Sequence, residues 1–191
     1  MRILIACEYS GIVREAFKNK GHDAWSCDLL PTEIEGNHYQ GNVFDIINEN
    51  WDLMIAHPPC TYLSNAGATS LFPKGILNEE RYKLGLEGKD FFIKLLNANI
   101  LKICVENPVP SKIFNLPPFS QIIQPYQFGH PFQKKTLLWL KNLPPLFSTN
   151  ITEARESTRT ARWFQLGGKN RRKNRAKFWT GIAEAMVDQW G

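Results

Sequence analysis

Short apolar runs alternate with amphipathic stretches along the first half of the chain. The apolar runs predict buried strands at residues 2–7, 23–28, 52–56 and 100–106. The stretches between them predict a helix at about 11–20, with Ser10 as its cap, and another at about 78–97. Strands that alternate with helices favour right-handed βαβ units, so the pattern predicts an α/β fold with a mostly parallel sheet.

Two stretches before residue 106 are less regular. Residues 41–45 fit a short strand or a turn, and residues 61–77 fit a loop. The helix predicted at 78–97 contains Gly85 and Gly88, which lower its intrinsic stability.

The second half of the chain is rich in proline and then becomes basic. Short strands are predicted at 121–124 and 136–140, and a last helix with one apolar face is predicted at about 176–190. Residues 148–177 are polar and show little periodicity. No run of about 18 apolar residues occurs, so no membrane span is predicted.

The formal net charge is +5, and the positive charge is concentrated late in the chain. Residues 169–177 hold six cations and no acid, which fits either a solvated face or a patch that contacts nucleic-acid phosphates. The candidate nucleic-acid contacts are Arg162, Lys169, Arg171, Arg172, Lys173 and Arg175. We therefore expect one domain made of residues 1–146 and 176–191, with residues 147–175 as a short basic insert.

Polar residues follow each predicted strand or short segment of the first half. These residues are Glu8-Tyr9-Ser10-Gly11, Asp28, Asn42 with Asp45, His57-Pro58-Pro59-Cys60 and Glu106-Asn107-Pro108. Ligands of open parallel sheets bind beyond the carboxyl ends of the strands. The sequence therefore predicts a functional site at this edge.

The first loop indicates what kind of cofactor the site would take. The loop has a single glycine, Gly11, and lacks both common phosphate-binding patterns. The N-terminus of the following helix favours an anion, so a cofactor with a carboxylate and no phosphate fits better. Asp28 stands where an acid would bind ribose hydroxyls, although it also fits an ordinary cap or turn residue.

Cys60 differs from the other three cysteines. Cys7, Cys27 and Cys104 lie in apolar runs and fit buried small hydrophobic residues, whereas Cys60 follows two prolines at the end of a strand. None of the four has zinc-site spacing, so no metal is predicted. A thiolate that attacks an unsaturated ring needs an acid beside it, and Glu106 fits that role. The alternatives are a structural cysteine in a loop and a surface acid that caps a turn.

Pro58-Pro59-Cys60 and Glu106-Asn107-Pro108 resemble the Pro-Cys and Glu-Asn motifs of cytosine-carbon-5 DNA methyltransferases, each placed after a strand. The resemblance implies a Rossmann-like, doubly wound methyltransferase fold, S-adenosylmethionine as cofactor and DNA as partner. It also implies that Cys60 forms a covalent adduct with cytosine while Glu106 protonates ring nitrogen 3.

The resemblance extends to further residues. It implies that the cofactor is held by Glu8, Tyr9, Ser10, Gly11, Asp28, Pro58 and either Asp45 or Asn42. Lys134 and Lys135 stand in place of two arginines that assist catalysis in the family. His57 stands where the family often has a small residue, and either a structural role or proton handling is open to it. The basic insert is short, so a target-recognition domain is minimal or absent.

Two other functions remain open at this level. The same chemistry would serve an enzyme that modifies carbon 5 of a free or already modified pyrimidine nucleotide. A catalytically degenerate DNA-binding protein is the other alternative. For all three functions the expected location is the cytoplasm of a bacterium or a phage-infected cell.

Overall fold

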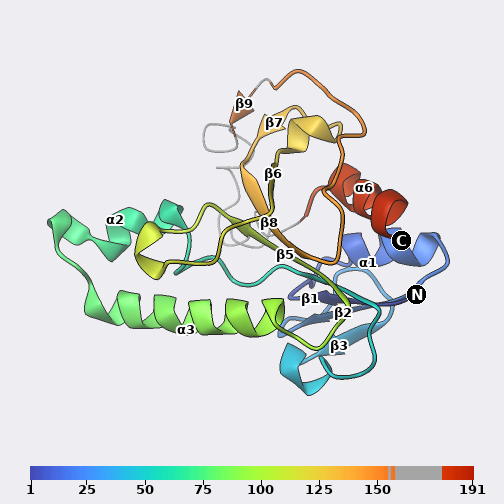
Figure 1. The fold of residues 1–191 in the computed structure, drawn as a ribbon, viewed down its shortest axis with the longest axis horizontal. Helices are drawn as coiled ribbons and strands as arrows, with labels where there is room; N and C mark the ends of the chain where they lie inside the picture. The colour runs from blue at the N-terminus through green and yellow to red at the C-terminus, as the bar shows by residue number, and fades with distance from the viewer. Residues whose placement is uncertain (155, 158–177) are drawn as a thin grey trace.

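A seven-stranded sheet with helices on both faces forms the centre of the molecule (Figure 1). The computed structural model describes residues 1–154, 156–157 and 178–191. Across the sheet the strands follow the order β3-β2-β1-β4-β5-β8-β6. In chain order they are β1 (Arg2–Ala6), β2 (Asp23–Asp28), β3 (His38–Gln40), β4 (Leu53–Ala56), β5 (Lys102–Pro108), β6 (Gln121–Ile123) and β8 (Thr136–Lys141).

The first five strands in this order run parallel, and β8 lies antiparallel to both β5 and β6. Five parallel strands in the order β3-β2-β1-β4-β5, followed by the antiparallel strands β8 and β6, form a Rossmann-like sheet. The predicted fold class, a doubly wound and mostly parallel α/β sheet, is therefore confirmed.

Helices and a small second sheet complete the described structure. The α-helices are α1 (Ile12–Asn19), α2 (Ala68–Leu71), α3 (Glu79–Leu96) and α6 (Thr180–Trp190). Short 3-10 helices lie at η1 (Val43–Asp45), η2 (Asn65–Gly67), η3 (Pro73–Gly75), η4 (Lys112–Phe114) and η5 (Pro125–Gln127). The second sheet pairs β7 (Phe132–Gln133) with β9 (Glu156–Ser157). None of the described helices has both the length and the apolar composition needed to cross a bilayer.

The two faces of the sheet carry separate apolar cores. On β1, Leu4 and Ala6 pack in the core beneath α3, whereas Ile3 and Ile5 pack in the core beneath α1 and α6. Successive side chains of a strand point to opposite faces, and both faces are covered here. This explains why the central strands are apolar throughout rather than alternating.

The strand register brings four strand ends to one edge. Ala6 lies opposite both Cys27 of β2 and Ala56 of β4, and Ala56 lies opposite Val105 of β5. The segments that follow these strands are therefore neighbours, at the place where an open parallel sheet binds ligands.

Most predicted elements are present, with shifted ends. The strand predicted at 23–28 is β2, and the helix predicted at 78–97 is α3, whose first turn is capped by Asn78 through a hydrogen bond from the Arg81 amide. The strand predicted at 100–106 instead covers residues 102–108, because pairing with β8 continues as far as Pro108.

Short elements account for the other differences. Residues 43–45 form the 3-10 helix η1, and the loop predicted at 61–77 contains α2 between two 3-10 helices. Strand β3 was not predicted, because its three residues contain no apolar run. The last helix begins at Thr180 within the described residues, later than predicted.

Close packing explains why α3 contains Gly85. A side chain at Gly85 would overlap the ring of Phe114, which is itself buried against the helix. Gly88, one turn later, has more room, since an added Cβ would lie 3.4 Å from Leu63 Cγ. The absent side chain at Gly85 thus lets η4 approach α3.

We expect Gly85→Ala to destabilise the protein by about 1–3 kcal/mol, the usual effect of overpacking a core. Gly88→Ala is the matched control, because both substitutions gain the same helix propensity of about 1 kcal/mol but only one meets a buried ring. Urea unfolding measures both free energies. Equal free energies for the two variants would show that Phe114 does not constrain Gly85.

Candidate functional site

Two side-chain contacts join the loop after β4 to the end of β5. His57 Nδ1 lies 3.2 Å from Glu106 Oε2. Asn107, which is fully buried, donates a hydrogen bond from Nδ2 to the Pro58 carbonyl oxygen at 3.1 Å. The parallel pairing of β4 with β5 places these neighbours side by side. The structure thus brings the Pro-Pro-Cys segment and the Glu-Asn-Pro segment together at the sheet edge.

Cys60 is partly exposed in the loop that leaves this junction. The Ser64 amide donates to the Cys60 carbonyl oxygen at 2.9 Å. From α3, Arg81 Nη2 donates to the Thr61 carbonyl oxygen at 2.8 Å, and its guanidinium lies 5.0 Å from the centre of the Tyr62 ring. Arg81 was not predicted to have a role, because nothing in its local sequence indicates contact with this distant loop.

Glu106 is held as a carboxylate. Burial tends to raise its pKa, but the hydrogen bond and positive charge of His57, together with Lys134, outweigh burial and keep the pKa below its ordinary value. Of the two predicted lysines, Lys134 is partly buried and acts on Glu106, whereas Lys135 is exposed. Glu106 is therefore ionised at neutral pH, although the expected role requires its acid form.

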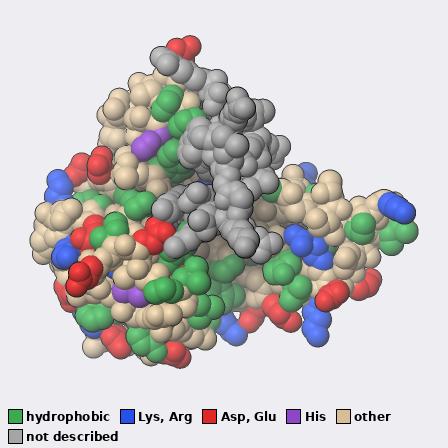
Figure 2. Space-filling view, turned by 180° about the vertical axis from the view of Figure 1, so that it is seen from behind, with side chains coloured by type: hydrophobic (Ala, Val, Ile, Leu, Met, Phe, Trp, Pro, Cys, Tyr) green, Lys and Arg blue, Asp and Glu red, His purple; other side chains and the backbone are tan. Residues whose placement is uncertain are grey.

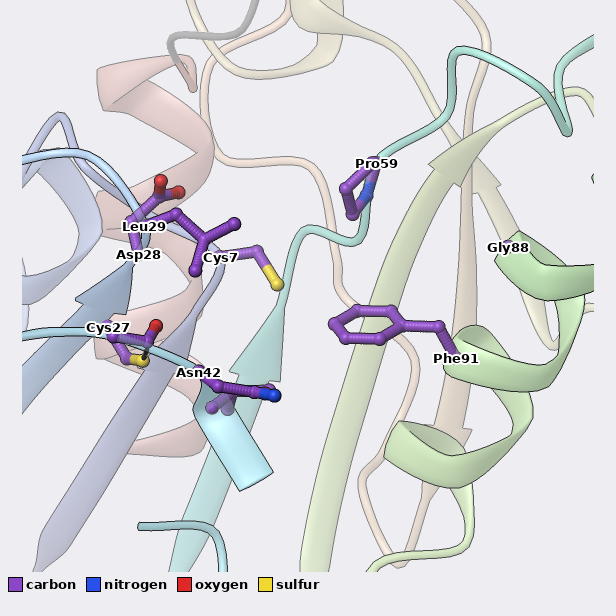
Figure 3. Close-up of a pocket in the computed structure, with 10 residues that line it drawn as sticks. Cys7, Cys27, Asp28, Leu29, Asn42, Pro59, Gly88 and Phe91 are labelled. Atoms are coloured by element: carbon purple, nitrogen blue, oxygen red, sulfur yellow. Dashed lines mark hydrogen bonds between the residues drawn. The ribbon is translucent and has the colours of Figure 1, made fainter. Parts of the chain in front are cut away.

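A cavity of about 260 Å³ opens at the same edge, between the ends of β1, β2 and β4 and the side of α3 (Figure 3). Its lining residues are Cys7, Cys27, Asp28, Leu29, Gly41, Asn42, Val43, Pro59, Gly88 and Phe91. Asp28 and Asn42 belong to the predicted cofactor set, and Pro59 lines the cavity where Pro58 was expected. The contribution of Phe91 and Gly88 was missed, because helical periodicity does not show which residues of α3 reach the sheet edge.

The cavity offers apolar walls and one fixed carboxylate. The Leu30 amide donates to Asp28 Oδ1 at 2.9 Å, which orients the Asp28 side chain. Burial, followed by the nearby charge of Asp28, raises the pKa of Cys27 to about 12, and the same causes raise the pKa of Cys7 still further. Both thiols are therefore neutral parts of the wall. The cavity is smaller than the roughly 300–1,000 Å³ of pockets that enclose whole ligands, so it suits part of an extended molecule.

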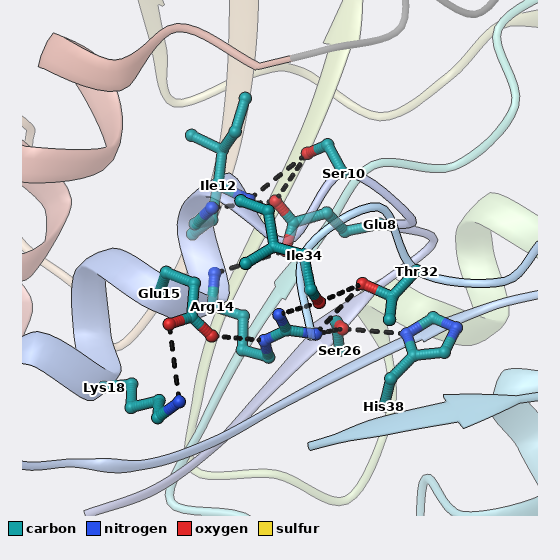
Figure 4. Close-up of polar contacts among 11 residues, drawn as sticks. Glu8, Ser10, Ile12, Arg14, Glu15, Lys18, Ser26, Thr32, Ile34 and His38 are labelled. Atoms are coloured by element: carbon teal, nitrogen blue, oxygen red, sulfur yellow. Dashed lines mark hydrogen bonds and ion pairs between the residues drawn. The ribbon is translucent and has the colours of Figure 1, made fainter. Parts of the chain in front are cut away.

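The N-terminus of α1 is capped by the side chain of Glu8 (Figure 4). Glu8 Oε1 accepts hydrogen bonds from the Val13 amide at 2.8 Å and from Ser10 Oγ at 3.0 Å. Glu8 Oε2 accepts from the Arg14 amide at 3.2 Å, and Ser10 Oγ accepts from the Ile12 amide at 3.3 Å. The sequence predicted a ligand carboxylate at this helix end, but in the structure the carboxylate of Glu8 occupies it.

Arg14 is fully buried and ties α1 to the loop that follows β2 (Figure 4). Its Nη1 donates to Ser26 Oγ at 3.0 Å and to Thr32 Oγ1 at 3.1 Å. Its Nη2 donates to the Ile34 carbonyl oxygen at 2.6 Å, and its Nε donates to Glu15 at 2.9 Å. The tethered loop begins at the cavity, so Arg14 stabilises one wall of the site. Sequence patterns indicated no role for it.

Gly11 is required at the turn before α1 for two reasons. Its φ of 75° lies in the left-handed region that favours glycine. A side chain there would also lie 2.8 Å from Arg14 Nη2. Gly11 does not line the cavity, so its visible role is to shape the turn.

The remaining predicted cofactor residues lie around the cavity. Tyr9 is buried, and burial with the charges of Glu33 and Asp28 raises its pKa to about 12. Asp45 accepts a hydrogen bond from the Tyr39 hydroxyl at 3.1 Å and does not line the cavity. Asn42 does line it, while its Oδ1 caps η1 through the Phe44 amide at 3.1 Å. Of the two alternatives predicted for the cofactor site, Asn42 is therefore the one at the cavity.

All six predicted nucleic-acid contacts lie outside the described residues: Arg162, Lys169, Arg171, Arg172, Lys173 and Arg175. The rest of the chain has a different charge balance. Nine of the 23 Lys and Arg residues and none of the 18 acids belong to residues 155 and 158–177, which leaves 14 cations against 18 acids. In Figure 2 acidic and basic side chains are interspersed over the described surface. The basic excess of the chain therefore comes from these residues, most of which belong to the predicted insert.

We expect Arg14→Met to lower the free energy of unfolding by about 3 kcal/mol, because it removes a fully buried guanidinium with a partly buried ion pair and three further hydrogen bonds. Lys18→Met is the control, since Lys18 also contacts Glu15, at 3.5 Å, but is exposed. Its loss should change stability by less than about 0.5 kcal/mol. Chemical denaturation of both variants checks this, and similar losses for the two would contradict the role assigned to Arg14.

No protein-family model and no curated protein sequence matches the chain. Two solved structures are similar in fold. One is a candidate DNA modification methyltransferase encoded within an E. coli prophage, with 14% identity, a TM-score of 0.47, and alignment over 79% of this chain and 51% of that one. The other is the Entamoeba histolytica methyltransferase EhMeth, with 15% identity, a TM-score of 0.47, and alignment over 78% of this chain and 57% of that one. The alignments thus span little more than half the length of these proteins.

Proposed function

We propose that the protein transfers a methyl group to carbon 5 of cytosine in DNA, through a covalent adduct with Cys60. The observation that carries this proposal is the junction of His57 with Glu106 and of Pro58 with Asn107. The junction places the segment bearing a partly exposed thiol beside a carboxyl group, next to a cavity. A nucleophile and a proton donor at one sheet edge are what addition to a pyrimidine ring requires.

Cys60 and Glu106 have different roles in the proposed reaction. The Cys60 thiolate bonds to carbon 6, and the displaced electron pairs move through carbons 5 and 4 to ring nitrogen 3. Glu106 delivers a proton to that nitrogen, so carbon 5 becomes nucleophilic. After methylation a base removes the carbon-5 proton, and Cys60 leaves as carbon 6 regains its double bond. Cytosine must first leave the base stack, which costs a few kcal/mol.

The cavity fits the nucleoside half of S-adenosylmethionine. Asp28 stands where a carboxylate would accept hydrogen bonds from ribose hydroxyls, and Phe91 and Val43 offer apolar surface to an adenine. The carboxylate of the methionine half was predicted to bind at the N-terminus of α1. It fits less well there, because the Glu8 side chain already accepts the hydrogen bonds of that helix end. S-adenosylmethionine bound in the cavity would supply the methyl group.

DNA as the partner is supported by the charge distribution. The described part of the chain has more acids than cations, whereas the predicted insert has a large cationic excess. Phosphate contacts of this kind give affinity and position without reading sequence. We therefore expect salt-sensitive binding with weak sequence preference.

A covalent trap tests the proposed reaction. A duplex with 5-fluorocytosine blocks the last step, because fluorine replaces the proton that must leave carbon 5. With S-adenosylmethionine present, we expect mass spectrometry to detect an adduct of wild-type protein and duplex that Cys60→Ala does not form. Thr61→Ala, a change at an exposed neighbour in the same loop, should retain the adduct.

The other candidate functions give different results in this experiment. An adduct with a fluorinated nucleotide but not with the duplex would favour the small-substrate enzyme. Salt-sensitive duplex binding without any adduct would favour a non-catalytic binding protein. Either result would contradict methyl transfer to DNA.

Asp28→Ala should weaken S-adenosylmethionine binding about tenfold or more, because it removes the carboxylate that we assign to the ribose hydroxyls. Asp23→Ala is the matched control, since Asp23 begins the strand that Asp28 ends and lies away from the cavity. Isothermal titration calorimetry of both variants measures the effect. Equal affinities would remove Asp28 from the cofactor site.

A further inference from the structure

The imidazole of His57 is held between a carboxylate and an aromatic ring. Its Nδ1 is 3.2 Å from Glu106 Oε2, and its ring centre is 4.6 Å from the ring centre of Phe178. The His57 and Glu106 side chains are only 12% and 13% exposed. This confinement fixes which atom of the imidazole faces the carboxylate.

The other ring nitrogen of His57 is buried and unused. Nε2 has no hydrogen-bond partner within the part of the chain that the structure describes. A buried polar atom of this kind is uncommon in native proteins and often has a functional cause. When the ring is neutral and carries its hydrogen on Nδ1, Nε2 is a bare acceptor that can take a second proton.

Among the described residues, Lys134 and Cys104 are the other charged or titratable groups that act on this pair. Lys134, which follows β7, acts on Glu106. Cys104, two residues before Glu106 on β5, stays neutral because burial raises its pKa well above the ordinary value. On the side of His57 that faces the start of α6, the ring contact is with the apolar side chain of Phe178. Within the described residues, His57 and Lys134 are thus the groups that favour the ionised form of Glu106.

An ionised Glu106 has no proton to give to the pyrimidine. Its carboxyl group has its pKa lowered by His57 and Lys134 despite burial. The proposed reaction nevertheless needs a proton at ring nitrogen 3 as the thiolate adds to carbon 6. The proton must therefore reach Glu106 from a group in contact with it that can carry a proton, and the imidazole of His57 makes that contact through Nδ1.

We propose that His57 and Glu106 act as one proton-sharing unit, in which His57 supplies the proton that Glu106 hands to the pyrimidine ring. The inference rests on the proposed function and assigns His57 as a positioning and proton-supplying residue that acts through Glu106. It also gives a reason for a histidine immediately before Pro-Pro-Cys.

The proton movements balance. Before addition the imidazole carries hydrogens on both nitrogens and Glu106 is a carboxylate. As the sulfur–carbon 6 bond forms, the Nδ1 proton of His57 moves to Glu106 and a proton moves from Glu106 to nitrogen 3. His57 becomes neutral, with its hydrogen on Nε2, and Glu106 is again a carboxylate. When Cys60 leaves, the nitrogen 3 proton returns along the same path, so the unit regains its initial state.

The first measurement does not depend on activity. Carbon-13 NMR of protein labelled at the glutamate carboxyl follows the titration of Glu106, with Glu106→Gln identifying its signal. We expect His57→Gln to move the titration to higher pH, because glutamine donates a hydrogen bond but carries no positive charge. His22→Gln, at the other end of the sheet, should leave the titration unchanged. An unchanged titration in His57→Gln would overturn the inference even if the enzyme is active.

The second measurement is the rate of adduct formation with the fluorinated duplex between pH 5 and 8. We expect His57→Gln to react about 100-fold more slowly than wild type near pH 7.5, the usual scale of one proton-transfer group. The deficit should shrink as the pH falls and solvent protonates Glu106. Both proteins share the pH dependence of thiolate formation at Cys60, so this dependence drops out of the ratio of the two rates.

These results separate the two proposals. Absence of an adduct with wild-type protein contradicts the proposed function, and the NMR titration still decides whether His57 controls Glu106. A wild-type adduct with a pH-independent rate ratio leaves the proposed function standing and overturns the proton-sharing unit. Loss of fold in His57→Gln would appear in the NMR spectrum, and His57→Asn then serves as the second variant.

Discussion

The site depends on one junction between two adjacent parallel strands. β4 and β5 end side by side, and the residues that follow are joined through His57 and Glu106 and through Pro58 and Asn107. Without these contacts the Cys60 loop and the Glu106 carboxyl group would share an edge of the sheet but not a fixed geometry. Catalytic groups are effective only when the supporting contacts hold them in place.

The same sheet edge has a different structure on each of its two sides. The cavity with Asp28 and Phe91 opens toward α3, whereas His57 packs against Phe178 near α6. The edge between them is where β1 and β4 lie adjacent and the chain changes direction across the sheet. Because such switch points leave a crevice, one fold can hold a cofactor and a reacting base as neighbours.

The sequence predicted what depends on local pattern. Buried strands such as β2 follow from apolar runs, and the extent of α3 follows from apolar residues at helical spacing. Asp28 and Asn42 could be placed because strand ends in a parallel sheet meet at one edge. Long-range contacts were not predictable: nothing near Arg14 indicates that it anchors a loop 20 residues away, and nothing near Glu8 indicates that it caps α1. The ionised state of Glu106 likewise depends on His57 and then on Lys134, both of which are distant in sequence.

A double-mutant cycle tests the junction most directly. His57→Ala, Glu106→Ala and the double variant are unfolded in urea at pH 7, and the coupling free energy is taken from the four stabilities. The account predicts a coupling of about 0.5–3 kcal/mol, as measured for residues in direct contact. It also predicts that the coupling falls once Glu106 is protonated at low pH. Additive effects at pH 7 would show that His57 and Glu106 do not interact and would contradict the account, because only the Asn107–Pro58 hydrogen bond would then join the two segments.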